Sequence, residues 1–207
     1  MALILLYPLD LDSRYFVWVA HTFFVIFLSF VCYHLSPRLL IFSFIILLGL
    51  ASSISALLVI FTNNDVVFFA RYTLMLLFYF FTIAVLLNDI TKQKVITTDL
   101  LLGSLCVYIL VALFFGSIYI HIEYYYPQSF DFGRIDVSAL SSSKEKVFNF
   151  VYFSFTTLCT VGFGDILPVS IFAKAVVIIE EITGIFYLAL LVSRLANAVV
   201  LRDPANK

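Results

Sequence analysis

Long apolar segments separated by short charged stretches dominate this chain. Because the hydrocarbon core of a bilayer is about 30 Å thick, a helix that crosses it needs roughly 20 apolar residues. Five segments reach this length, the last of them with a few charges inside it. They are residues 15–35, 39–61, 66–87, 100–122 and 167–201. The pattern predicts an all-α integral membrane protein with about five transmembrane helices.

A sixth apolar segment, residues 147–164, differs from the others because its last third consists largely of Thr, Cys and Gly. Such residues continue a helix poorly. We therefore expect a short helix at about 145–159, followed by non-helical residues 160–165. Non-helical backbone at membrane depth is tolerated only where protein or a water-filled cavity surrounds it.

Composition supports a membrane protein and excludes several classes of function. Of the 207 residues, 63% are hydrophobic and 12% are charged, whereas a soluble domain has about 25% charged residues. The net charge of −1 leaves no basic face, so nucleic acid is excluded as a partner. No nucleophile–base spacing or phosphate-binding loop is present. We expect no enzymatic activity and no cofactor.

The chemistry of the chain is concentrated in residues 160–165, which read Thr-Val-Gly-Phe-Gly-Asp. Glycines 162 and 164 can adopt backbone angles that are barred to other residues. Successive carbonyl groups could then point one way and replace the water shell of a dehydrated cation. This sequence resembles the selectivity filter of potassium channels, in which a Thr-Val-Gly-Tyr-Gly loop coordinates K⁺.

The resemblance extends over roughly residues 100–201. It does not cover the N-terminal membrane region, 1–99, for which the apolar pattern alone predicts three spans (about 15–35, 39–61 and 66–87). It implies a pore domain, 100–201, with an outer helix at 100–122, a re-entrant pore helix at about 145–159, a filter at 160–165 and an inner helix at 167–201. Residues 184–195 are similar to the inner helix of small bacterial channels of the two-helix pore type. The implied location is therefore multi-pass in a bacterial inner membrane.

Potassium-selective passive conduction is the function that the resemblance implies. The permeant K⁺ would be coordinated at Thr160, Val161, Gly162, Phe163 and Gly164, with no structural metal site elsewhere. One chain supplies one filter segment, and a ring of carbonyls needs several. Closed cyclic symmetry is the usual solution, and the resemblance sets the number at four, a homotetramer in the lipid bilayer.

Other residues are expected to support the filter. Phe163 stands where many potassium channels have Tyr, so it has no hydroxyl to hold the filter, and we expect aromatic packing from the pore helix instead. We expect this packing from Phe153 and Phe155, with a contribution from Tyr152. The full set of expected supporting residues is Asp165, Thr156, Thr157, Cys159 and Phe153.

The inner helix carries the candidates for gating. Gly184 lies nineteen residues after Asp165, where the family commonly has a hinge, although a close helix–helix contact would also explain a glycine. Glu180 and Glu181 are costly inside a span and are functional hypotheses by default. One alternative is structural pairing with the pore helix or Lys174, and the other is gating or pH sensing. The expected pore-facing stripe consists of Ile185, Leu188, Val192 and Ala196.

The first three spans contain a single arginine, Arg71. A voltage sensor needs several gating charges, so we expect no voltage sensor. The six residues after Leu201 leave no room for a cytosolic ligand-binding domain, so we do not expect one either. Three alternatives remain: a cation transporter with a filter-like loop, a nonconducting accessory membrane subunit, and an intramembrane enzyme. The third lacks paired catalytic groups at one depth.

Overall fold

The structure is a computed structural model of the 207-residue chain. It describes residues 18, 21–23, 25–30, 39–62, 65–93, 98–133 and 143–202.

The described residues contain four long apolar helices, which makes this an all-α membrane protein, as the sequence predicted. These helices are α3 (Leu39–Thr62), α4 (Asp65–Lys92), α5 (Thr98–Tyr125) and α7 (Ile171–Arg202). Each is long and apolar enough to cross a bilayer. Most of the expected first span, 15–35, lies outside the described residues, although its described residues 21–23 and 25–30 are helical.

The chain divides into two compact units, Met1–Leu86 and Leu87–Lys207. The division falls within α4, somewhat before the boundary at residue 99 that the sequence suggested.

Polar contacts between apolar helices hold the first unit together. The Nε2 atom of His21 lies 3.0 Å from the Ser52 hydroxyl, and the Trp18 indole N–H donates to the main-chain oxygen of Ser53 at 2.9 Å. Interhelical hydrogen bonds of this kind help helices associate in lipid, where apolar burial gives little driving force. In α4, the Arg71 guanidinium lies 5.4 Å from the centre of the Tyr72 ring.

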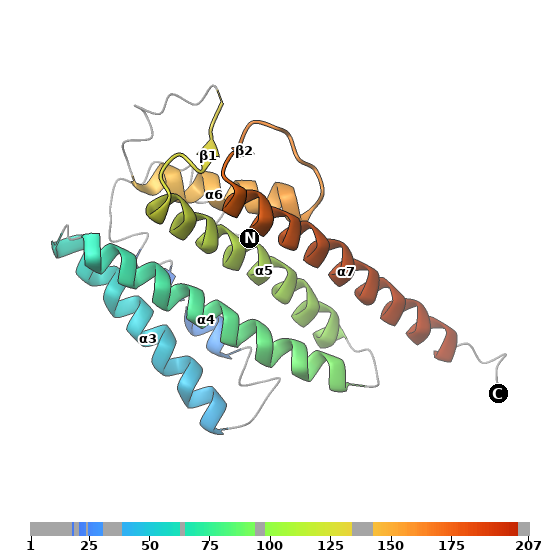
Figure 1. The fold of residues 1–207 in the computed structure, drawn as a ribbon. Helices are drawn as coiled ribbons and strands as arrows, with labels where there is room; N and C mark the ends of the chain where they lie inside the picture. Colours follow the sequence, from blue (N-terminus) through green and yellow to red (C-terminus); the bar gives the residue numbers. More distant parts are fainter. Residues whose placement is uncertain are drawn as a thin grey trace. The chain divides into compact units, whose positions relative to one another are not determined.

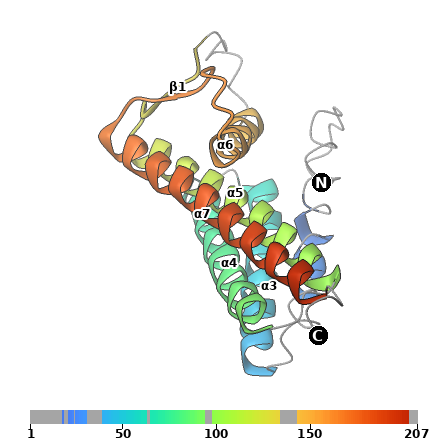
Figure 2. The same ribbon diagram turned by 90° about the vertical axis from the view of Figure 1, so that its right-hand side faces the viewer.

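In the second unit, α5 and α7 run antiparallel, as Figures 1 and 2 show. Two contacts establish this direction: Tyr119 of α5 reaches Glu180 of α7, whereas Ser104, earlier in α5, contacts Tyr187, later in α7. The short helix α6 (Ser143–Leu158) packs against both of them at the end where α7 begins. Helices α5, α6 and α7 therefore pack against one another next to residues 159–165.

A two-residue antiparallel pairing joins the loops on either side of α6. Strand β1 (Phe130–Asp131) pairs with β2 (Leu167–Pro168). This pairing corrects the expected start of the inner helix: α7 begins at Ile171 and not at residue 167, because Leu167 and Pro168 are extended. The Ser170 hydroxyl then accepts the N–H of Ala173 at 3.1 Å, as an N-cap residue does.

The remaining helix boundaries lie close to the predicted ones. Helix α6 spans 143–158 where about 145–159 was expected, and α5 spans 98–125 where 100–122 was expected. The apolar runs thus locate the helices, but two predicted bounds are wrong by several residues. Helix α4 continues to Lys92, five residues beyond the predicted end at 87, because the polar residues 88–92 stay helical, and α7 begins four residues after the predicted start.

Candidate functional site

The sign of the backbone angle φ alternates along residues 160–164. Thr160, Gly162 and Gly164 have positive φ angles of 58°, 52° and 75°, while Val161 and Phe163 between them do not. In chains that alternate between right- and left-handed residues, successive N–H groups point to the same side, so their carbonyl groups point to the other. This geometry permits a row of oxygen atoms suited to a cation.

Helix α6 anchors this segment through its last turn. The main-chain oxygen of Thr156 accepts the N–H groups of Val161 at 2.8 Å and Gly162 at 3.2 Å, and that of Thr157 accepts the N–H of Thr160 at 2.9 Å. The carbonyl groups at a helix C-terminus need such partners. Because a helix C-terminus also carries a partial negative charge, the end of α6 favours a cation beside residues 160–164.

Tyr152 supports the segment from α6. Its ring is stacked parallel to that of Phe163, with 6.4 Å between centroids and 2° between planes. Its hydroxyl donates to Asp165 Oδ2 at 2.7 Å, and Asp165 Oδ1 accepts the N–H of Ile166 at 3.0 Å. Aromatic packing on Phe163 was expected mainly from Phe153 and Phe155, and the described ring that stacks on Phe163 is instead that of Tyr152.

The other expected supporting residues lie around the end of α6. Phe153 is buried against the rings of Tyr119 and Phe130, at centroid distances of 5.3 and 5.7 Å. Its ring therefore packs on the side of α6 that faces α5 and β1, and not on Phe163. Thr156 and Thr157 are buried, and they act through their main-chain oxygens. Cys159 is exposed, with its sulfur 3.6 Å from the Tyr108 hydroxyl.

Tyr108 of α5 also contacts this region, and the sequence did not predict it. Its hydroxyl donates to the main-chain oxygen of Leu158 at 3.1 Å, and its ring stacks on Tyr187 of α7 at 5.7 Å. The available signal was a tyrosine inside an apolar span, because a buried tyrosine hydroxyl usually finds a hydrogen-bond partner.

The segment and one face of α7 are open in the single chain. Val161 is 52% exposed and Phe163 is 69% exposed. The stripe predicted to face a pore is exposed as well, and it consists of Ile185, Leu188, Val192 and Ala196. The chain alone therefore leaves both the carbonyl row and this apolar face uncovered.

The two intramembrane glutamates have different surroundings. Glu180 is completely buried, and its carboxyl group contacts the hydroxyls of Tyr119 and Ser154. Glu181 is exposed. One turn after Glu180, Gly184 lies against the carbonyl of Leu158. Pairing of one glutamate with α6 was one of the two alternatives drawn from the sequence, and a gating role for either residue stays a prediction.

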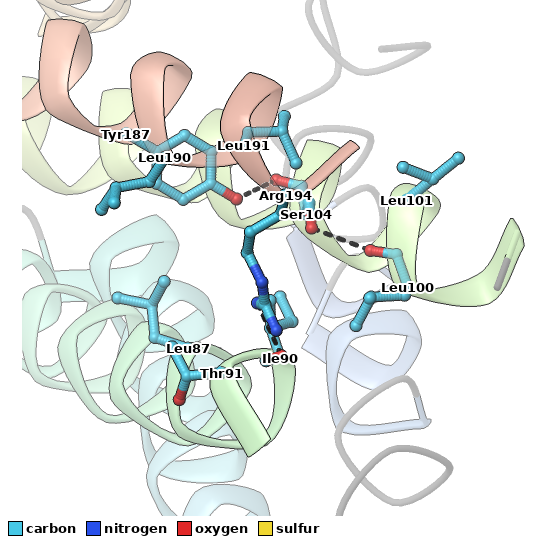
Figure 3. Close-up of a pocket in the computed structure, with 10 residues that line it drawn as sticks. All are labelled: Leu87, Ile90, Thr91, Leu100, Leu101, Ser104, Tyr187, Leu190, Leu191 and Arg194. Atoms are coloured by element: carbon cyan, nitrogen blue, oxygen red, sulfur yellow. Dashed lines mark hydrogen bonds between the residues drawn. The ribbon is translucent and has the colours of Figure 1, made fainter. Parts of the chain in front are cut away.

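The far end of the second unit holds a mainly apolar cavity of about 220 Å³, shown in Figure 3. Arg194 of α7 lies at its edge and donates to the main-chain oxygens of Ile90 at 2.7 Å and Gln93 at 2.9 Å. The Tyr187 hydroxyl donates to the Ser104 oxygen at 2.5 Å on the other side. Since carbonyls at the end of α4 bind this guanidinium, Arg194 has a structural role here.

Comparison with known families supports an ion channel. Residues 107–200, slightly less than half of the chain, match a family model described as an ion channel. That range includes most of α5 and all of α6, residues 160–164 and nearly all of α7. Comparisons with curated proteins and with solved structures gave no match.

Proposed function

We propose that the protein is a potassium-selective channel in which four copies of the chain place residues 160–164 around one axis and conduct K⁺ passively. The observation that carries the proposal is the alternating backbone of the Thr-Val-Gly-Phe-Gly sequence. The ion-channel match over residues 107–200 includes this sequence.

The chemistry of the segment suits a dehydrated monovalent cation. Rings of backbone carbonyls replace the hydration shell of K⁺ in selectivity filters, and main-chain oxygens from Thr160 to Phe163 would supply them here. The Thr160 hydroxyl would add a ligand at the inner end. No described side chain needs to change its charge, because the ion crosses by exchange between neighbouring sites.

Assembly follows from the exposure of this same region. Non-helical backbone does not face lipid inside a bilayer, yet Val161 and Phe163 are more than half exposed in one chain. Other copies or a water-filled pore must therefore surround them. With one segment per chain, a closed ring of identical subunits provides both.

Ion flux from liposomes tests the proposal. The purified full-length protein is reconstituted into liposomes loaded with K⁺. The outward K⁺ gradient drives uptake of tracer cations, which is compared for K⁺, Rb⁺ and Na⁺, with protein-free liposomes as the control. We expect uptake of K⁺ and Rb⁺ well above that of Na⁺, together with a mass of four chains in native mass spectrometry. Equal uptake of the three ions, or no uptake by an assembled protein, would reject potassium selectivity or conduction, respectively.

A further inference from the structure

A buried carboxyl group joins the three helices of the second unit. Glu180 projects from α7, and its two oxygens contact the hydroxyls of Tyr119 on α5 and Ser154 on α6. All three side chains have no exposed surface. An acidic side chain inside a membrane span is energetically costly, so the contacts that Glu180 makes with two other helices indicate a specific role.

The number of hydrogen atoms available to these contacts is limited. The Ser154 hydroxyl contacts not only Glu180 but also the main-chain oxygen of Ala112, at 2.6 Å. A serine hydroxyl has one hydrogen to donate, and a carbonyl oxygen only accepts. Ser154 therefore cannot donate to Glu180 and Ala112 at the same time.

Two protonation states of the carboxyl group can be compared. If Glu180 is ionised, Ser154 gives its hydrogen to one partner, and its other contact places two oxygen atoms together without a hydrogen between them. If Glu180 carries a hydrogen, it donates to Ser154, and Ser154 donates to Ala112. Tyr119 donates to the second carboxyl oxygen, so each of the three contacts then has one hydrogen.

The surroundings of Glu180 offer no positive charge among the residues that the structure describes. The groups that act on it electrostatically are Tyr119 and Tyr108 of α5 and the neighbouring Glu181 of α7, and α6 contributes the neutral Ser154. Lys174, two turns earlier in α7, is exposed. Burying an unpaired charge is far more costly than burying a hydrogen-bonded neutral group.

We propose that Glu180 is held as a neutral carboxylic acid that fastens α7 to α5 and α6 and thereby acts as a positioning residue for residues 160–164. Ser154 lies two positions before Thr156, whose main-chain oxygen holds the N–H groups of Val161 and Gly162. The proton state rests on these contacts and on the burial of Glu180, while the positioning role rests on the proposed function.

Infrared spectroscopy tests the proton state without any measurement of conduction. The full-length protein in lipid nanodiscs is examined at about pH 7 for the C=O stretch of a protonated carboxyl group, identified by its shift in D₂O. We expect this band in the wild type, its loss in Glu180→Gln, and its retention in Glu181→Gln, the matched control with an exposed side chain. Absence of the band from the wild type, or its persistence in Glu180→Gln, would overturn the proposal.

Two substitutions test the positioning role. The amide of Glu180→Gln can accept from Tyr119 and donate to Ser154, so we expect cation flux within about twofold of the wild type. Glu180→Leu fills the space but leaves the buried Tyr119 hydroxyl without its partner, which destabilises the packing of α7 against α5. We expect a lower thermal midpoint and a flux at least about tenfold lower, which corresponds to about 1.4 kcal/mol.

The outcomes separate this inference from the proposed function. Equal flux and equal thermal midpoint in the wild type and Glu180→Leu would overturn the positioning role. A wild type that conducts no cation would reject the proposed function, whereas the infrared band and the thermal midpoints would still decide whether the neutral carboxyl group joins the helices.

Discussion

A Cβ atom built on Gly184 of α7 would stand 2.5 Å from the main-chain oxygen of Leu158, the last residue of α6. Real Cβ atoms essentially never approach another atom so closely. The glycine thus allows α7 to touch the backbone that leads into residues 160–164. Helix α7 runs without a break through this position, and a hinge function for Gly184 stays a prediction.

Gly184→Ala should separate α7 from the end of α6. On helix propensity alone, the substitution would stabilise α7 by about 1 kcal/mol, so a loss of stability isolates the contact with Leu158. We expect a lower thermal midpoint of the assembled protein and reduced flux. Ala189, on the exposed face of α7, offers the matched control, since Ala189→Gly reports propensity without this contact. A Gly184→Ala protein more stable than the wild type would contradict the close packing.

Thr160→Gly should stabilise the protein while impairing its selectivity. Thr160 is β-branched and has a φ of 58°, a conformation that costs a non-glycine residue about 1–3 kcal/mol. Glycine removes this strain and also removes the hydroxyl proposed to bind the ion. We expect a higher thermal midpoint together with a smaller preference for K⁺ over Na⁺. Thr160→Ser, which retains the hydroxyl, serves as the control, and unchanged ion preference in Thr160→Gly would exclude the hydroxyl as a ligand.

Tyr152 and Asp165 should show energetic coupling. Tyr152→Phe keeps the ring stacked on Phe163 and removes only the hydroxyl that donates to Asp165. A double-mutant cycle with Asp165→Asn, read from thermal unfolding, should give a coupling free energy of about 1 kcal/mol, the usual net contribution of one hydrogen bond. Additive effects within error would show that the hydrogen bond does not stabilise the protein.

Conduction should depend only weakly on voltage. One charge moved through 100 mV gains about 2.3 kcal/mol, and Arg71 would give a tetramer at most about four such charges. Voltage ramps on the reconstituted protein should therefore show a shallow change in open probability. Steep activation that persists in Arg71→Gln would place the moving charge at another residue.

The sequence predicted those parts of the fold that depend on local apolar content. The bounds of α3 differ from the prediction by one residue, since charged or polar residues end the apolar run on both sides. The start of α7 could not be found in this way, because β2 pairs with β1, which lies far away in the sequence.

The backbone geometry of the candidate site was predicted only in part. Glycines 162 and 164 were expected to take left-handed backbone angles. The positive φ of Thr160 could not be predicted, because β-branched residues rarely adopt it. The partners of Glu180 come from two other helices. An acidic residue inside a span shows that partners are needed, and only the packing of α5 and α6 shows which residues they are.

The reversal potential under bi-ionic conditions, with K⁺ on one side of a planar bilayer and Na⁺ on the other, tests the central claim most directly. The wild type should reverse at a potential that shows strong preference for K⁺. Gly162→Ala should lose that preference or stop conducting, because a φ of 52° disfavours a residue with a Cβ atom, even though nothing lies within 4 Å of the position that this atom would take. Thermal unfolding and native mass spectrometry show whether the variant still assembles. An assembled Gly162→Ala protein with the same preference for K⁺ over Na⁺ as the wild type would contradict the account.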